Sequence, residues 1–217
     1  MIYKDLKKRF FTSIILLVFV FFIFKFKYLM GLILIIFGVL SILEFLNLSK
    51  KIFNKSKFYF LISNTLFISY IIFFSYFFFL FSVFENLKIL LLIILLTCVA
   101  SDIGGYIFGN LLKGPKLSKI SPKKTISGAV GSLFFSCSTI LIIAKLTNNY
   151  FSPNLILVGI CSSTASQLGD LFFSYLKRKA KIKDTGNILP GHGGILDRLD
   201  GIFFGLPIGL LTLLFAA

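Results

Sequence analysis

The chain is a succession of long apolar runs separated by short polar connections. The runs extend over about residues 10–24, 28–46, 58–84, 87–108, 126–146, 151–173 and 201–217. A helix needs about 20 apolar residues, within a range of roughly 17–25, to cross the hydrocarbon core of a bilayer. The pattern therefore predicts an all-α polytopic membrane protein with about seven transmembrane helices. The Phe-rich residues 67–84 are interpreted as lipid-facing or core bulk.

The composition supports membrane insertion. Hydrophobic residues make up 57% of the 217 residues and charged residues only 14%, against about 45–50% and 25% in soluble domains. The net charge of +15 could indicate a nucleic-acid-binding protein. However, the basic residues lie in the connections between apolar runs, where they set topology and meet anionic lipid headgroups. We therefore expect membrane lipids, and no nucleic acid, as partners.

The basic residues also predict the orientation of the chain. Nineteen of the 23 Lys and Arg residues lie before the first run or in the connections after the second, fourth and sixth runs. The positive-inside rule places this side in the cytoplasm. The N-terminus is then cytoplasmic and the C-terminus lies on the opposite side.

No repeat, linker or soluble segment divides the chain, so residues 1–217 are expected to form a single integral-membrane domain. Ionisable groups at membrane depth are costly and are candidates for function. Five of the eight acidic residues lie beyond residue 97, on the predicted cytoplasmic side: Asp102, Asp170, Asp184, Asp197 and Asp200. We therefore interpret residues 1–97 as scaffold spans and residues 98–217 as catalytic spans and loops.

The connection at residues 174–200 concentrates both signs of charge around a Gly-His-Gly-Gly turn. Phosphate groups require cations and a divalent metal requires carboxylates, so the mixture indicates a metal–phosphate site. Asp170, Ser174 and Lys177 follow one another at i, i+4 and i+7. They share one helix face if the sixth helix continues past Gly169.

Asp197 and Asp200 lie where the last apolar run begins. Capping alone could explain them, because acidic residues are favoured in the first turn of a helix. Alternatively, two helix ends that present aspartates at one depth could share Mg²⁺. The glycine-rich residues 187–194 can form a nest of N–H groups that accepts phosphate. Within them, His192 is expected to orient phosphate or the loop, or to transfer a proton.

A second group of candidate residues lies in and after the fourth run. Asp102 stands within the run, where helix packing does not explain it, whereas Gly105 and Gly109 form a small-residue surface typical of close helix packing. Lys123 and Lys124 follow in the next connection. They are either topology-setting charges or contacts for a phosphate-bearing substrate.

These two blocks resemble the signature of the bacterial phosphatidate cytidylyltransferases, the CDP-diacylglycerol synthase family. The elements Asp-x-Gly-Gly-Tyr-x-x-Gly and Ile-Ser-Pro-Lys-Lys-Thr are present from Asp102 onward. Ile126 and Ser127 depart from the pattern, since many relatives have Trp and Glu there. The longer element, with Ser-x-apolar-Lys-Arg, Lys-Asp and His-Gly-Gly-x-x-Asp-Arg-x-Asp, is filled by Ser174, Lys177, Arg178, Lys183, Asp184, His192, Gly193, Gly194, Asp197, Arg198 and Asp200.

The resemblance implies transfer of the cytidylyl group of CTP to phosphatidate, giving CDP-diacylglycerol and pyrophosphate for phospholipid biosynthesis. The site would face the cytoplasm from a bacterial inner membrane. The implied catalytic residues are Asp170, Ser174, Lys177, Asp197 and Asp200, of which Asp170, Asp197 and Asp200 bind Mg²⁺, with a second cation left open. The implied substrate-binding residues are Asp102, Lys123, Lys124, Arg178, Lys183, His192, Gly193, Gly194 and Arg198.

Other classes of function remain open. An anion transporter should show paired broken helices or repeats in both halves, and a membrane scaffold needs no such group of charges. Another membrane-embedded nucleotidyl- or phosphotransferase acting on a lipid phosphate is the nearest alternative. Gly201, Gly205 and Gly209 recur at every fourth position and predict close helix packing, either within the protomer or in a homodimer.

Overall fold

The computed structural model describes residues 25–118, 120–148, 154–186, 188 and 193–216. These residues form α2 (Lys27–Ile52), α3 (Lys57–Val83), α4 (Glu85–Leu112), α5 (Ile126–Asn148), α6 (Asn154–Lys179) and α7 (Leu196–Ala216). Six helices of this described part are long and apolar enough to cross a membrane. The all-α polytopic class is thus confirmed. The expected span at residues 10–24 lies outside the described residues.

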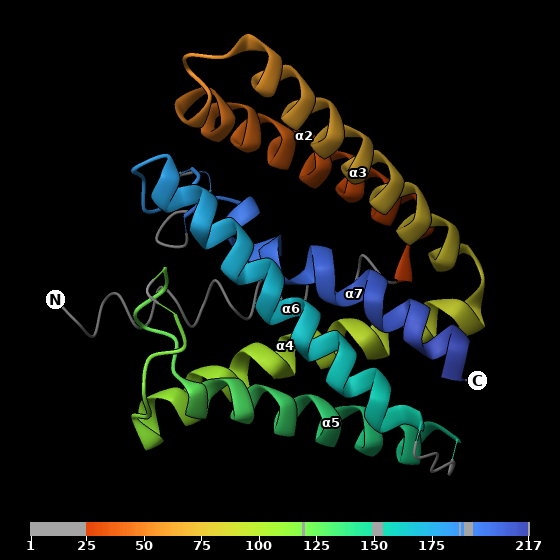
Figure 1. The fold of residues 1–217 in the computed structure, drawn as a ribbon. Coiled ribbons are helices and arrows are strands. Elements are labelled where there is room, and N and C mark those ends of the chain that lie inside the picture. The colour runs from red at the N-terminus through yellow and green to blue at the C-terminus, as the bar shows by residue number, and fades with distance from the viewer. Residues whose placement is uncertain (1–24, 119, 149–153, 187, 189–192, 217) are drawn as a thin grey trace, which may run out of the picture.

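The helices pack as three pairs, α2–α3, α4–α5 and α6–α7, with α6–α7 between the other two (Figure 1). α6 also packs on α5, and α7 on α4. α3 is one helix over its whole length, so the long third run forms a single span. α6 continues six residues past the expected end at residue 173, into the basic turn that finishes at Lys179. Basic side chains in a last turn are favoured by the helix dipole.

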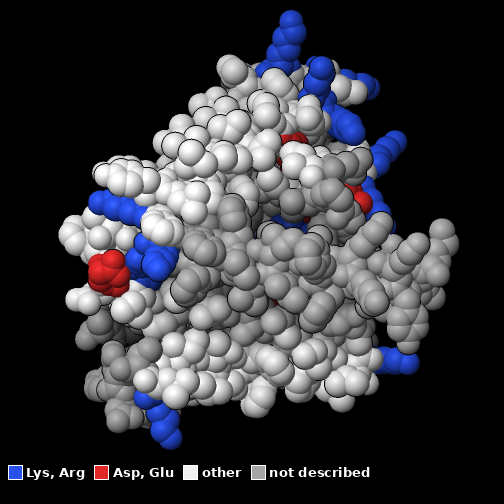
Figure 2. All heavy atoms as spheres, turned by 180° about the vertical axis from the view of Figure 1, so that it is seen from behind, with Lys and Arg blue, Asp and Glu red and all other residues white. Residues whose placement is uncertain are grey.

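The connections that carry most of the charge emerge at one end of the bundle. These are residues 53–56, the α4–α5 connection (113–125) and the α6–α7 connection (180–195) (Figure 1). Figure 2 shows Lys and Arg side chains projecting at this end and a smaller group at the opposite end. Three of the four predicted basic groups thus lie at one end of the bundle, and the fourth, before the first run, lies outside the described residues. Their assignment to the cytoplasm stays a prediction.

The α2–α3 pair contacts α6–α7 through aromatic side chains. The rings of Phe45 and Phe67 stack with centroids 3.9 Å apart, and Phe67 meets Phe173 edge to face at 6.3 Å. The edge-to-face arrangement is favourable for aromatic pairs. The interior on this side is therefore built largely from the Phe-rich α3.

α6 and α7 approach closely because glycines line the contact. A Cβ atom on Gly201 would lie 2.6 Å from Ser166 Oγ, and one on Gly209 would lie 2.3 Å from Ser162 Oγ. Small residues at such contacts allow helix backbones to approach one another within a membrane. The predicted small-residue packing is confirmed, and it lies within the protomer.

Candidate active site

Six charged side chains from four segments come together at the end of the bundle where the basic connections emerge. We call them the charged cluster. Its members are Asp102 from α4, Lys124 from the α4–α5 connection, Asp170 and Lys177 from α6, and Asp197 and Asp200 from α7. All six were predicted as site residues from the sequence.

The more accessible side of the cluster is the pair of Lys124 and Asp170. Lys124 Nζ donates to Asp170 Oδ2 at 2.5 Å, and the two side chains are 28% and 32% exposed. Asp102 lies close enough to both to interact with them electrostatically. The pair joins residues 46 positions apart in the chain, so it depends on the packing of α6 beside the α4–α5 connection.

The backbone of the α4–α5 connection places Lys124. Lys116 and Thr125 form an isolated antiparallel β-bridge, and Leu117 N donates to the Lys124 carbonyl at 2.8 Å. Ser127, which departs from the family pattern, accepts a hydrogen bond from Gly114 N at 3.3 Å and thereby closes the base of this connection.

The deeper side of the cluster centres on Lys177. Its Nζ lies 2.7 Å from Asp197 Oδ1 and 3.9 Å from Asp200 Oδ2, and all three side chains are at most 13% exposed. The carboxyl group of Asp200 also adjoins that of Asp170. Because α6 is unbroken through Lys179, Asp170 and Lys177 lie two turns apart on one face, as predicted.

Asp197 also holds the α6–α7 connection in place. Its Oδ2 accepts hydrogen bonds from the backbone N–H groups of Thr185 at 2.8 Å and Gly194 at 3.1 Å. Gly193 adopts a φ of +81°, a conformation that favours glycine. Asp197 thus accepts backbone N–H groups, as the capping interpretation expected. The N–H groups belong to the connection before α7, however, and not to the first turn of α7.

A second carboxylate holds the same connection and was not among the predicted residues. Glu44 in the middle of α2 is 3% exposed. Its Oε1 accepts from Ile195 N at 3.0 Å, and its Oε2 accepts from Leu196 N at 2.9 Å and from Thr185 Oγ1 at 2.7 Å. Glu44 therefore satisfies N–H groups at the start of α7, which a helix cannot bond internally.

Glycines make room for the Glu44 carboxylate. A Cβ atom on Gly194 would lie 2.3 Å from Glu44 Oε2, and one on Gly186 would lie 2.7 Å from Oε1. One sequence signal could have indicated Glu44, since it is a lone carboxylate within an apolar run, the feature that singled out Asp170. A helix interpreted as scaffold therefore makes direct contact with the candidate site.

The remaining predicted residues belong to the same segments of the chain. Ser174 is half-buried on α6, and Lys123, Arg178, Lys183 and Arg198 are exposed. Within the described part of the chain, no ion pair joins Lys123, Arg178 or Lys183 to an aspartate. His192 lies outside the described residues, as does most of the glycine-rich segment 187–194.

The donor set of the cluster suits a magnesium ion. Carboxylate oxygens are the ligands that Mg²⁺ prefers, and those of Asp170 and Asp200 adjoin. The cluster has four carboxyl groups against two ammonium groups, an excess of acidic groups that a divalent cation would balance. Among the described residues, no three Asp, Glu, His or Cys side chains converge as a metal site. The metal stays a prediction.

The sequence is similar to proteins of known function. The model of the cytidylyltransferase family matches residues 3–216. A phosphatidate cytidylyltransferase of Rickettsia bellii is 45% identical over 127 residues, covering 54% of this chain and 55% of the relative. The phosphatidate cytidylyltransferase of Staphylococcus haemolyticus is 50% identical over 112 residues, which cover 50% of this chain and 42% of the relative. That of Helicobacter pylori is 40% identical over 139 residues, which cover 63% of this chain and 51% of the relative. The chain thus spans about half the length of the curated relatives it matches.

Proposed function

Because the chain belongs to the cytidylyltransferase family, we propose that it transfers the cytidylyl group of CTP to phosphatidate, giving CDP-diacylglycerol and pyrophosphate. The names of its relatives support this substrate pair. The observation that carries the proposal is the charged cluster at one end of a membrane-spanning bundle. Such a place is accessible to a soluble nucleotide and to the headgroup of a membrane lipid.

The chemistry requires charge stabilisation more than proton transfer. A phosphate oxygen of phosphatidate is already anionic, so it can attack the α-phosphorus of CTP without a strong base. The new bond forms between that oxygen and the α-phosphorus, while the bond to the β-phosphate breaks and pyrophosphate leaves with its electrons. The barrier lies in bringing two polyanions together, which positioned cations lower electrostatically.

The two lysines of the cluster differ in their accessibility, and this suggests separate roles. Lys124 is about a quarter exposed and is suited to contact the triphosphate. Lys177 is buried between Asp197 and Asp200 and is suited to meet the reacting phosphates. We expect the exposed Lys123, Arg178, Lys183 and Arg198, together with His192, Gly193 and Gly194, to bind the outer phosphates. Ser174, one turn from Asp170 on α6, is expected to contact the reacting groups.

The adjoining Asp170 and Asp200 would hold Mg²⁺, and Asp197, which pairs with Lys177, is expected to contribute a third carboxylate. When bound, the metal would neutralise charge on the phosphates. Aspartate and phosphate oxygens together provide the oxygen ligands that this ion requires. A second cation at the site is left open.

The inner leaflet of a bacterial cytoplasmic membrane is the expected location. Basic connections emerge at the same end as the cluster (Figures 1 and 2), and the positive-inside rule assigns this end to the cytoplasm, where CTP is made. An anion transporter is less well supported, because each of the six described helices is continuous, whereas such transporters use paired broken helices.

The purified chain in detergent micelles, supplied with phosphatidate, Mg²⁺ and CTP, should produce CDP-diacylglycerol that mass spectrometry identifies. ATP, GTP or UTP in place of CTP tests the nucleotide, and diacylglycerol in place of phosphatidate tests the lipid phosphate. Absence of the liponucleotide from wild-type protein that is monodisperse would contradict the proposal.

A further inference from the structure

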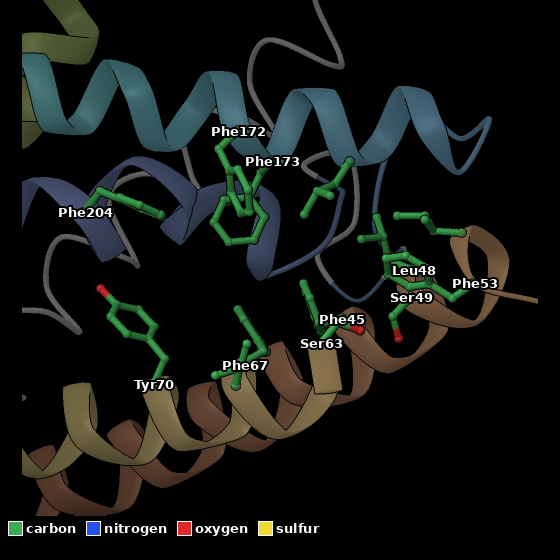
Figure 3. A pocket seen from close by; sticks show the side chains of 13 residues that line it. Phe45, Leu48, Ser49, Phe53, Ser63, Phe67, Tyr70, Phe172, Phe173 and Phe204 are labelled. Atoms are coloured by element: carbon green, nitrogen blue, oxygen red, sulfur yellow. The ribbon is translucent and has the colours of Figure 1, made fainter. Parts of the chain in front are cut away.

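An apolar cavity of about 470 Å³ lies between the α2–α3 pair and the α6–α7 pair (Figure 3). Its volume is within the range of roughly 300–1,000 Å³ that is typical of ligand pockets. The lining consists mostly of aromatic and aliphatic side chains from all four helices. The cavity is therefore large enough and apolar enough to hold a hydrocarbon group.

The three hydroxyl groups in the lining are already bonded to the protein. Ser49 Oγ donates to a neighbouring side chain or carbonyl, Ser63 Oγ donates to the Phe60 carbonyl at 3.1 Å, and the Tyr70 hydroxyl donates to the Phe203 carbonyl. A polar occupant would lose its hydrogen bonds to water and gain few in return, which is costly. The lining thus favours a wholly apolar occupant.

The cavity lies beside the charged cluster. Phe172 and Phe173 stand two and three residues after Asp170, Leu176 precedes Lys177, and Phe204 stands one turn after Asp200. On α2 and α3 the lining lies near the α2–α3 turn, which emerges at the same end of the bundle (Figure 1). On α6 and α7, at most about one helical turn of chain therefore separates these lining residues from Asp170, Lys177 and Asp200.

We propose that this cavity binds one acyl chain of phosphatidate while the lipid phosphate lies at the charged cluster. The proposal rests on the proposed function and adds a second contact region to the same site. α3 runs away from the charged end, so Tyr70 lies deeper than Ser63. Its hydroxyl bridges α3 to the backbone of α7. Tyr70 therefore closes the deep end of the cavity and limits the length of chain that fits.

Photocrosslinking tests the proposal directly and needs no turnover. The purified chain is mixed, without CTP, with phosphatidate that carries a diazirine in one acyl chain. We expect the label on the peptides that contain residues 63–70 and 172–176, and we expect unlabelled phosphatidate to displace it. Phosphatidylcholine with the same acyl chain should label these peptides at least tenfold less, because it lacks the phosphate monoester that the lysines would bind.

Ser63→Phe fills the cavity, and Ser69→Phe is its matched control. Both serines lie on α3 and donate to the carbonyl three residues earlier, at 3.1 Å and 2.9 Å, but Ser69 is exposed and lies outside the cavity. Ser63→Phe should abolish the crosslink and raise the KM for long-chain phosphatidate at least tenfold, since each methylene that leaves an apolar site costs about fourfold in affinity. The KM for CTP should not change, and a six-carbon phosphatidate should be affected much less.

Equal labelling by phosphatidylcholine would overturn the proposal, because the cavity would then accept any membrane lipid. Label elsewhere in the wild-type chain, or label that survives in a monodisperse Ser63→Phe variant, would also overturn it. If Ser63→Phe does not fold, the labelling pattern of the wild-type chain alone decides whether the cavity binds the acyl chain. Phosphatidate-specific labelling in a chain that forms no CDP-diacylglycerol would support the cavity and contradict the proposed function, so the two failures are distinguishable.

Discussion

The Glu44 carboxylate accepts a hydrogen bond from the Thr185 hydroxyl at 2.7 Å, although 141 residues separate them in the chain. The same carboxylate accepts the N–H groups of Ile195 and Leu196. It thus fixes the α6–α7 connection to α2 at two points, near its middle and at its end. Asp197, which faces Lys177, accepts N–H groups from this connection as well. The position of the charged cluster therefore depends on a residue from a distant helix.

Glu44→Gln should loosen the connection and lower activity. The glutamine amide has no negative charge, and its NH₂ group would face N–H and O–H donors in place of an accepting oxygen. Hydrogen bonds to a charged group contribute about 1.5–3 kcal/mol each. We expect a lower Tm in detergent, faster proteolysis between residues 180 and 195, and at least a tenfold loss of kcat. Glu85→Gln is the control, because that side chain is 80% exposed and bonds only Lys88 in the described structure. Equal behaviour of the two variants would refute the role of Glu44.

Asp170→Asn and Asp197→Asn should separate metal binding from loop stability. Asp170 bonds Lys124 and adjoins Asp200, so its amide variant should keep its Tm but lose at least about 10²-fold in turnover, the scale of one preorganised electrostatic contact. Asp197 accepts two backbone N–H groups, so its amide variant should lose both Tm and turnover. Titration of activity with Mg²⁺ checks the ligand role. Near-normal turnover and unchanged Mg²⁺ dependence in both variants would contradict it.

Lys177→Ala should lower kcat by about 10²-fold or more, because this ammonium is buried between two aspartates of the cluster. Lys179 and Lys181 are exposed, and alanine at either should change little beyond membrane affinity, at about 1 kcal/mol per charge near an anionic surface. Comparison of kcat in detergent micelles that contain phosphatidate removes the contribution of membrane affinity. Similar losses at all three positions would indicate a diffuse basic surface in place of a defined site.

The orientation of the chain can be checked by cysteine labelling in intact cells, after Cys98, Cys137 and Cys161 are replaced by alanine. A membrane-impermeant maleimide added outside should label Lys145→Cys and leave Lys181→Cys unmodified, because the two exposed side chains lie at opposite ends of the bundle. Efficient labelling of Lys181→Cys from outside would reverse the assignment of the charged end.

Residue patterns within one segment predicted much of this fold and site. The 3.6-residue period placed Asp170 and Lys177 on one face, and α6 is continuous through both. Lys124 and Asp197 are also predicted as site residues from the sequence. Their pairing with Asp170 and Lys177, however, depends on how the helices pack. Glu44 was missed because a single carboxylate in an apolar run does not reveal which distant N–H groups it will accept.

The cavity was also beyond sequence reasoning. The Phe-rich residues 67–84 were interpreted as lipid-facing or core bulk, and part of this stretch fits, since Phe73 and Tyr76 are more than 60% exposed. Phe67 and Tyr70, however, line the cavity beside the cluster. An apolar side chain has the same sequence pattern whether it faces lipid, a helix or a ligand, so only the packing of four helices distinguishes these cases.

The central claim is that the charged cluster directs transfer of the α-phosphate of CTP, with its nucleoside, to a lipid phosphate. The most direct test supplies the purified chain with phosphatidate, Mg²⁺ and CTP labelled on either the α- or the γ-phosphate, and then measures label in the extracted lipid. Label should enter the lipid from α-labelled CTP alone, and Asp170→Asn should slow its entry at least about 10²-fold. Label that enters from the γ-phosphate would indicate a phosphotransferase, and the absence of label from both would contradict the account.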